Sequence, residues 1–365
     1  MAAASDAIAR LTVRLGAIVE NFRLCGKLSG TNVAGVIKAD SYGLGAERVA
    51  RTLADAGCDT FFVARLDEGI SIRPAIPQAR IFVLDGVLEG NVERFIANRL
   101  TPVLNTLEEI SIWSGVAAAR HTMLDAAIHF DTGMNRLGLS PGELSVLSAG
   151  HAQRLSGINV VLLMSHLACS DDPTSEMNAA QLERFQASLA MLPAAPASLA
   201  ASGGVLLGKQ YAFDLVRPGL ALYGGDPRTD TINPFHTVAQ LTGRILQVRR
   251  VDKGESVGYG ATFRTARPST LATVALGYAD GLMRAIGNRG SGAIEGIRVP
   301  VAGRVSMDLI TLDVTDVPSA KPGAEVEFVG STISLEEAAR AAGTANYEIL
   351  TGLGTRFPRH YVSES

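Results

Sequence analysis

A single lysine follows an apolar run early in the chain. Residues 34–38 read AGVIK, and a glycine-punctuated turn that contains Tyr42 comes next. The simplest interpretation is that Lys38 solvates the end of a buried strand. In a desolvated, cation-rich pocket, however, the pKa of such an amine falls well below its reference value of about 10.4, and the neutral amine becomes a nucleophile. Lys38 is therefore a candidate for a Schiff base with a carbonyl compound.

Two further motifs could hold an anion. The sequence SGG begins at Ser202, and RPGL begins at Arg217 and includes Gly219 and Leu220. Backbone N–H groups and a hydroxyl in the last loops of a β/α barrel commonly bind phosphate. Alone, SGG is more simply an ordinary turn. A reactive lysine and a phosphate loop in one site together indicate pyridoxal phosphate as the cofactor.

Eight short apolar runs lie before residue 235 and must position these side chains. They are continuous rather than alternating, which is typical of parallel strands buried on both faces. Helix signatures separate them: Thr106 and Ser140 read as N-caps with a glutamate three residues later, and residues 181–192 read as an amphipathic helix. This rhythm predicts an α/β fold with a (β/α)8 TIM-type barrel over residues 1–235. The predicted strands are 32–38, 60–64, 80–85, 100–105, 125–131, 158–166, 197–202 and 213–217.

Polar side chains stand at the carboxyl ends of these predicted strands, where barrel enzymes place their chemistry. Any strand end can be polar without a function, so each side chain needs a second clue. Lys38 has one, because it is the only lysine in the set. The set is Lys38, Arg65, Asp85, Asn105, Asp131, His166, Ser202 and Arg217.

The rhythm changes at a connector rich in proline, aspartate and threonine, residues 226–234. Alternating strand-like segments separated by Gly and Pro follow, which predicts a smaller, mostly β domain over residues 236–365. One late helix is expected there, begun by Ser334 with Glu337. Residues 11–15, LTVRL, alternate like a strand but precede the barrel.

Composition limits the class of protein. The chain has 365 residues, 47% of them apolar, and a net charge of −3 without a long basic run, so neither disorder nor a nucleic-acid partner is indicated. No stretch resembles a secretory signal or a membrane span, and the three cysteines are scattered, so we expect a cytoplasmic protein without a membrane partner. The histidines show no metal-ligand spacing, so no catalytic metal is expected.

Nine stretches, in this order and spacing, resemble alanine racemase over about residues 10–362. The resemblance implies a barrel followed by a C-terminal β domain, with strand 11–15 joining the latter. The implied activity is the interconversion of L- and D-alanine, with pyridoxal phosphate as cofactor. The stretches are VIKADSYGLGA (36–46), DTGMNRLG (131–138), MSHLA (164–168), ASGG (201–204), VRPGLALYG (216–224), SVGYGATF (256–263), ALGYADG (275–281), AGRVSMD (302–308) and YEILTGLGTRFPRHY (347–361).

The resemblance also assigns roles around the cofactor. Lys38 would carry it as a Schiff base and act as one base, taking the proton from the D-isomer. Arg217 would face the pyridine nitrogen, which disfavours protonation there and limits transamination. Arg136 would reach the phenolic oxygen and the substrate carboxylate, and His166 would lie against the ring. The phosphate would be held by Tyr42, Ser202, Gly219 and Leu220.

The remaining roles would come from a partner subunit in a homodimer with shared active sites. Tyr259 would be the second base, taking the proton from the L-isomer, and Tyr278 and Met307 would border the substrate. Without the resemblance, the simpler interpretations are a turn aromatic for Tyr259, a core side chain for Tyr278, a buried histidine for His166 and a helix cap for Arg217.

The chain departs from the family pattern at five positions, and three other functions stay open. His129 stands where many members have a lysine that becomes carbamylated and braces the arginine. The alternatives are a racemase of broader or serine specificity, a basic-amino-acid decarboxylase and a non-catalytic pyridoxal-phosphate-binding protein. A decarboxylase would need an acidic residue where Arg217 stands, and the non-catalytic proteins resemble the barrel alone. The five departures are Leu44, His129, Ala201, Ser306 and Thr355.

Overall fold

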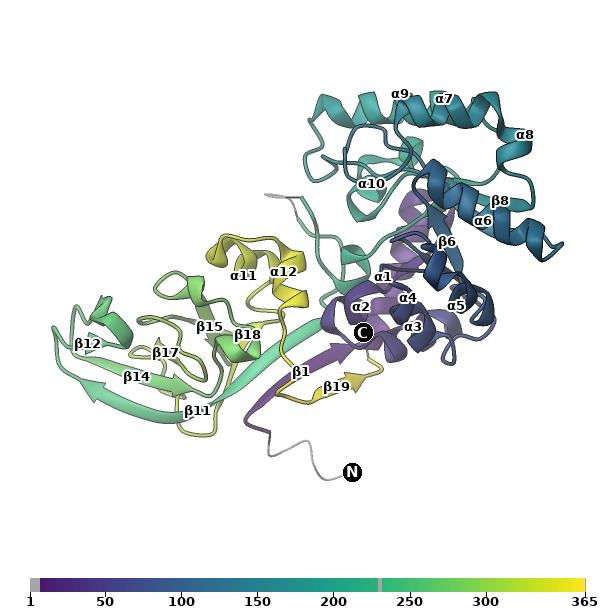
Figure 1. Cartoon of the computed structure of the whole chain (residues 1–365). Helices are drawn as coiled ribbons and strands as arrows, with labels where there is room; N and C mark the ends of the chain where they lie inside the picture. Colours follow the sequence, from purple (N-terminus) through teal and green to yellow (C-terminus); the bar gives the residue numbers. More distant parts are fainter. Residues whose placement is uncertain (1–6, 229–231, 365) are drawn as a thin grey trace.

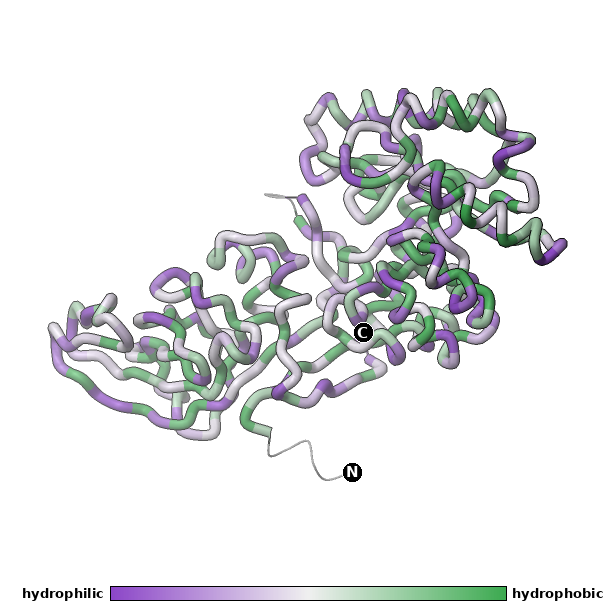
Figure 2. The backbone as a smooth tube through the Cα atoms, in the orientation of Figure 1, coloured by the Kyte–Doolittle hydropathy of each residue, from purple (hydrophilic) through white to green (hydrophobic). Residues whose placement is uncertain are grey.

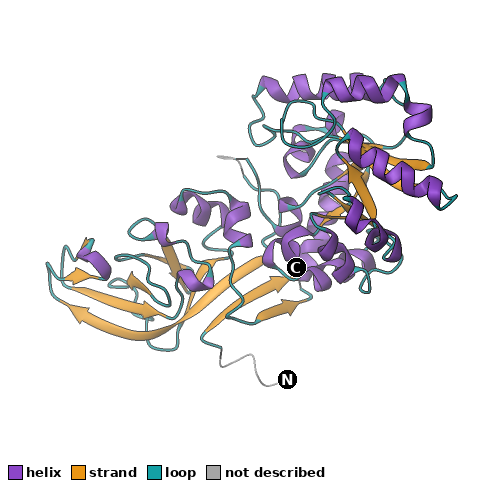
Figure 3. Ribbon diagram, in the orientation of Figure 1, coloured by secondary structure: helices purple, strands orange, loops and turns teal. Residues whose placement is uncertain are grey.

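The computed structural model describes residues 7–228 and 232–364. Its first part is a parallel sheet surrounded by helices, and its second part is a mostly antiparallel sheet with two helices (Figure 1, Figure 3). No helix within these ranges is both long and apolar enough to span a membrane.

Seven parallel strands, β3 to β9, form one curled sheet in sequence order. The short strand β2 (Asn32–Val33) runs into β3 and pairs in parallel with β10 (Leu215–Val216). Ala34 N–H donates to Val216 O at 2.9 Å, and Arg217 N–H donates to Ala200 O at 2.8 Å. These bonds join the last predicted strand to the first and to the seventh, so the expected barrel closes. The strands are β3 (Gly35–Val36), β4 (Thr60–Val63), β5 (Arg80–Val83), β6 (Thr101–Leu104), β7 (Leu124–His129), β8 (Ile158–Met164) and β9 (Ala197–Ser198).

Helices cover the outside of this sheet. The Oγ1 of Thr106 accepts Glu109 N–H at the start of α6, and Ser140 and Glu143 form a reciprocal capping box at α7, as the sequence predicts. Figure 2 shows hydrophobic and hydrophilic residues alternating along these helices, as expected where one face packs on a sheet. The helices are α1 (Leu15–Ser29), α3 (Ala46–Asp55), α4 (Leu66–Ile72), α5 (Val92–Ala97), α6 (Leu107–Ala119), α7 (Pro141–Ala149), α8 (His151–Arg154), α9 (Glu176–Leu189) and α10 (Ser202–Leu207).

Two elements begin or end at other residues than the sequence predicts. The run 213–217 is a strand only at Leu215–Val216, because Phe213 has a φ of 53° and Pro218 has no N–H to donate. The helix predicted at 181–192 is α9, which begins at Glu176 and ends at Leu189. It stops before Pro193, whose ring disfavours a helical conformation in the preceding residue.

The second part is built on the 13-residue strand β11 (Ala239–Val251). The early strand β1 (Ala9–Arg14) pairs antiparallel with β11 and parallel with β19 (Arg359–Val362), and its Leu11 and Val13 are fully buried. Ser334 caps the late helix α11, accepting Glu337 N–H at 3.1 Å. The other elements of this part are β12 (Ser256–Val257), β13 (Phe263–Arg264), β14 (Ser269–Val274), β15 (Ser291–Ile294), β16 (Ile297–Pro300), β17 (Ile310–Asp313), β18 (Glu325–Val329), α11 (Leu335–Ala342) and α12 (Asn346–Thr351).

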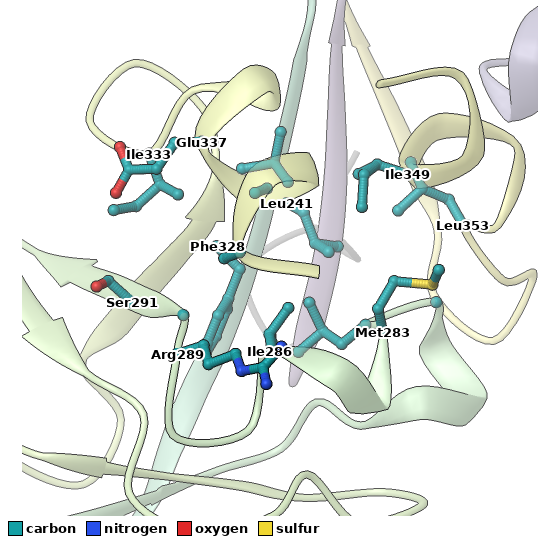
Figure 4. A pocket seen from close by; sticks show the side chains of 16 residues that line it. Leu241, Met283, Ile286, Arg289, Ser291, Phe328, Ile333, Glu337, Ile349 and Leu353 are labelled. Atoms are coloured by element: carbon teal, nitrogen blue, oxygen red, sulfur yellow. The ribbon is translucent and has the colours of Figure 1, made fainter. Parts of the chain in front are cut away.

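The inside of the barrel is filled by side chains, and a small cavity lies elsewhere. Phe62 and Phe82 stack inside the barrel with ring centroids 4.7 Å apart. A cavity of about 60 Å³ lies in the second part, where Leu241, Phe328 and Ile349 point into it (Figure 4). None of the predicted site residues lines this cavity.

Candidate active site

Lys38 stands where the first barrel strand ends. It begins α2 (Lys38–Gly43), a single turn in which Ser41 N–H donates to Ile37 O at 3.0 Å. The four residues Ala39–Tyr42 have φ between 52° and 55°, so this turn is left-handed. Residues with a Cβ disfavour that conformation by roughly 1–2 kcal/mol each. Contacts from outside the turn must therefore stabilise it.

Some of these contacts come from the C-terminal segment. Arg359 Nε donates to Gly43 O at 2.8 Å, and Tyr361 Oη donates to Leu44 O at 3.1 Å. Gly43 has a φ of 80°, and a Cβ there would lie 2.7 Å from Leu350 O. Glycine is therefore required at this position, and β19 and α12 close over the end of the turn.

The Lys38 amine has a lowered pKa. Burial lowers it most, and the positive charge of Arg136 lowers it further, while Glu68 and Asp85 act in the opposite direction. A lysine whose neutral form is favoured in this way can act as a nucleophile and as a base.

Four residues predicted to bind a phosphate lie together where this turn meets the end of the last barrel strand. Ser202 Oγ accepts the N–H groups of Gly219 and Ala221, each at 3.1 Å, and its own O–H can still donate. A Cβ on Gly219 would lie 2.4 Å from Tyr42 Oη, so the phenol approaches the backbone closely. Burial raises the pKa of Tyr42, which keeps the phenol a donor. Leu220, the residue after Gly219, is fully buried.

Arg217 is a buried cation at the same end of the barrel, with only 4% of its surface exposed. Its Nη1 donates to Ser198 Oγ, and its Nη2 donates to Ser165 O at 2.6 Å. Burial lowers the pKa of the guanidinium to about 9, so it stays charged at neutral pH. Ser165 and Ser198 therefore hold a fixed positive charge in the barrel mouth.

Two histidines stand at the ends of neighbouring strands. His129 ends β7, and His166 follows β8 by two residues. Burial and the charges of Arg217 and Arg136 lower the pKa of both rings, that of His129 to about 4. Both imidazoles are therefore neutral at pH 7, and the same two arginine charges favour the neutral form of each ring.

Asn105 fixes the tautomer of His129. Its Nδ2 donates to Leu84 O at 3.2 Å and to Val103 O at 2.9 Å, so its Oδ1 faces His129 Nδ1 at 2.8 Å. An amide oxygen can only accept, so Nδ1 carries the hydrogen and Nε2 is an acceptor.

Arg136 lies on a loop that leaves and rejoins the end of β7. Asp131 N–H donates to Leu139 O at 2.9 Å, and Leu139 N–H donates to His129 O at 2.8 Å. The Asp131 carboxylate also accepts the N–H groups of residues 133–135. Arg136 is exposed, and its guanidinium forms no hydrogen bond with the residues of 7–228 and 232–364. It is available to a small carboxylate.

Tyr259, Tyr278 and Met307 lie on exposed loops of the second part. Tyr278 N–H and the next N–H along the chain donate to Ser306 O and Met307 O at 3.0 Å, and the turn at Tyr259 packs on residues 303–304. Tyr259 is 73% exposed. Figure 1 shows β12, which directly precedes this turn, at the opposite end of the second part from α2. One chain does not bring Tyr259 to Lys38.

Sequence reasoning overlooked three contributors. Ser165 and Ser198 hold Arg217, and the signal was a small polar residue inside or beside an apolar strand. Glu68 contacts the turn after Lys38. Glu68 is the third residue of a helix that follows a barrel strand, and a carboxylate at that position commonly binds backbone N–H groups at the helix start. This signal could have identified Glu68 from the sequence.

These groups fit pyridoxal phosphate. A lysine with a lowered pKa, the hydroxyls of Tyr42 and Ser202 close to the Gly219 backbone, and a fixed cation at Arg217 meet at one end of the barrel. Within the described ranges, no three His, Cys, Asp or Glu side chains are grouped to hold a metal ion.

Comparison with known proteins agrees with this geometry over both parts of the chain. Residues 13–227 match the family described as "Alanine racemase, N-terminal domain", and residues 238–361 match "Alanine racemase, C-terminal domain". An alanine racemase of Rhodospirillum rubrum is 49% identical, covering 97% of this chain and 96% of the relative. A catabolic alanine racemase of Agrobacterium fabrum is 47% identical, covering 99% and 94%.

A solved structure is similar throughout. The crystal structure of alanine racemase from Bartonella henselae with covalently bound pyridoxal phosphate has a TM-score of 0.93 and 38% identity, and the match covers 98% of this chain and all of that one. The barrel with its second, β-rich part and the sequence matches along both lead to one conclusion: this chain is a member of the alanine racemase family.

Proposed function

We infer that this protein is a pyridoxal-phosphate-dependent racemase that interconverts L- and D-alanine. The observation that carries this function is the meeting of Lys38 with the Ser202–Gly219 anion cradle and the fixed cation Arg217 at one barrel mouth. When bound, pyridoxal phosphate withdraws electrons from the α-carbon of an amino acid joined to it, which makes the α-proton removable.

Lys38 is proposed to carry the cofactor and then to move a proton at its Nζ. Burial and Arg136 favour its neutral form, which a base requires. Tyr42, Ser202 and the backbone at Gly219 and Leu220 hold the phosphate, and the exposed Arg136 binds the substrate carboxylate.

Arg217 is proposed to face the pyridine nitrogen. Its two terminal nitrogens are bound by Ser198 and Ser165, so its charge cannot move away. An arginine offers donors and no acceptor, so it leaves a neighbouring ring nitrogen unprotonated. This moderates the electron withdrawal and disfavours transamination.

The second base is proposed to be Tyr259 of a second copy of the chain. Racemisation needs proton transfer on both faces of the α-carbon, and Lys38 serves one face. Tyr259 is exposed, as are Tyr278 and Met307, and the strand β12 that precedes it lies far from α2, which begins at Lys38 (Figure 1). A homodimer with two equivalent shared sites would complete both centres.

Subunit exchange between Lys38→Ala and Tyr259→Phe tests this proposal. After random exchange about half of the dimers are mixed, and each has one site with both bases intact, so activity should return to about a quarter of wild type. Activity that stays at the level of the two parents, with exchange confirmed by mass, contradicts the shared site. A panel of amino acids that includes serine would separate alanine specificity from a broader one.

We also propose a cytoplasmic location. Cys25, Cys58 and Cys169 are free, and burial raises the pKa of the first two thiols to about 12. Unpaired thiols are typical of proteins in a reducing compartment.

A further inference from the structure

Glu68 bridges the ends of the first two barrel strands. It is the third residue of α4, which follows β4. Its Oε1 accepts Ala39 N–H at 2.7 Å, and its Oε2 accepts Ala64 N–H at 2.8 Å and Arg65 N–H at 3.1 Å. One carboxylate thus joins the residue after Lys38 to the end of the neighbouring strand.

Two of these donors, Ala39 and Arg65, stand at the start of a helix. Ala39 lies in the first turn of α2, and Arg65 is the N-cap of α4, where helix N–H groups have no acceptor within the helix. Ala39 is also the first of the four residues with positive φ. Glu68 therefore binds the left-handed turn at the point where it leaves Lys38, while Arg359 and Tyr361 bind its other end.

The same carboxylate acts on the Lys38 amine. The charged and titratable groups that act on this amine are Glu68 on α4, Asp85 after β5, Arg136 on the loop after β7 and His166 after β8. The carboxylate opposes the effects of burial and of Arg136 on Lys38, so it is placed to set both the position and the proton affinity of the amine.

We propose that Glu68 is a positioning residue for Lys38, which it serves by tying the left-handed turn to the end of β4 and by adding a negative charge to the surroundings of the amine. This role rests on the proposed function, because Lys38 matters as the cofactor lysine and as a base.

Two variants separate the reach of this side chain from its charge. Glu68→Gln keeps the length, removes the charge and turns an NH₂ group toward one set of N–H donors. Glu68→Asp keeps the charge but is shorter by one methylene, so it cannot bridge both strands. Asp67→Asn is the matched control. Asp67 is the residue before Glu68, but its carboxylate is exposed and pairs with Arg94 instead.

The first readout is cofactor capture by enzyme from which the cofactor has been removed. Lys38 Nζ condenses with the aldehyde of pyridoxal phosphate and water leaves, so the rate follows the neutral amine. In Glu68→Gln the pH midpoint of this rate should fall, because loss of the negative charge favours the neutral amine. In Glu68→Asp the midpoint should stay near that of wild type.

The second readout is steady-state racemisation by the loaded enzyme. In both Glu68 variants kcat should fall by roughly 10-fold or more while KM stays within about two-fold, because a displacement of about 1 Å at a reacting group costs up to about 100-fold in rate. Asp67→Asn should match wild type in both readouts.

Two results together overturn the proposal: the pH midpoint of cofactor capture in Glu68→Gln equals that of wild type, and kcat of Glu68→Asp equals that of wild type. This holds even if both variants unfold at a lower temperature than wild type. If Glu68→Gln does not fold, the comparison of kcat between Glu68→Asp and Asp67→Asn decides. Equal kcat values in these two variants overturn the proposal, and a kcat lowered only in Glu68→Asp supports it. If wild-type protein neither captures pyridoxal phosphate nor racemises alanine, the proposed function itself fails, which is a different result.

Discussion

The neutral His129 predicts a measurable pH dependence of stability. Its pKa falls from 6.5 to about 4 in the folded protein, because of burial and of the charges of Arg217 and Arg136. Between these two pH values the unfolded chain binds a proton that the folded chain does not. Stability therefore rises with pH over this window: the contribution is fully present above pH 6.5 and is lost as pH falls toward 4, and its size is about 3 kcal/mol.

His129→Gln removes this titration while keeping a neutral donor for Asn105. Equilibrium urea unfolding of both proteins, at fixed protein and cofactor concentration, gives the free energy of unfolding at each pH. Between pH 6.5 and 4, the free energy of unfolding of wild type should fall by about 3 kcal/mol more than that of the variant. His166, whose pKa is also lowered, titrates in both proteins; His129 is the last and smallest of the charges that lower its pKa, so most of the His166 contribution cancels in the difference.

Above pH 7 the two curves should run parallel, since His129 is neutral in both the folded and the unfolded state there. If the free energy of unfolding falls equally steeply in both proteins below pH 6.5, His129 is not held neutral in the folded protein. The tautomer assigned through its hydrogen bond with Asn105 would then be wrong as well. A steeper variant would refute the sign of the effect.

Three further predictions concern the reaction. Lys38→Ala should lose the visible absorbance band of the bound cofactor and roughly 10²–10⁴-fold in racemisation, and full activity without an added amine would contradict the cofactor assignment. Arg217→Glu should racemise more slowly, by roughly 100-fold, and give a larger share of transamination, measured as pyruvate formed per racemisation event; unchanged partitioning would refute the role of the fixed cation. His129→Lys tests how Arg136 is braced: if the family's carbamate forms in the variant, bicarbonate should lower KM for alanine there but not in the parent, and no effect in either would show a site rebuilt around another partner.

The barrel could be predicted because burial on both faces makes its strands continuous apolar runs. Segments such as 60–64 and 80–85 read correctly, and each strand lies where it was expected. Ends were harder to predict, since the length of a strand depends on pairing with neighbours distant in sequence. The run 213–217 illustrates this, because only two of its residues pair as a strand.

The candidate site could be predicted in part. Lys38, Ser202 and Arg217 follow apolar runs, so the rule that strand ends carry the chemistry selects them. That rule cannot select Tyr259, which lies on an exposed turn of the other part, and only the family resemblance pointed to it. The role proposed for Tyr259, as a base for a second copy of the chain, would leave no local pattern in its own chain.

The left-handed turn after Lys38 could not be predicted, and the reason is physical. Its four residues, Ala39–Tyr42, include no glycine, and local preference disfavours a positive φ for each of them. The turn exists because Glu68 binds its start from 29 positions away and Arg359 binds its end from 316 positions away.

The geometry of the reactive amine is therefore a property of the whole chain rather than of the barrel alone. A barrel without the second part could keep Lys38 and Glu68, but it would lose the hydrogen bonds of Arg359 and Tyr361 to the turn. It would also lack the surface that carries Tyr259. The C-terminal part thus contributes to both proposed bases, since it holds the lysine turn of its own chain and is proposed to supply Tyr259 to its partner.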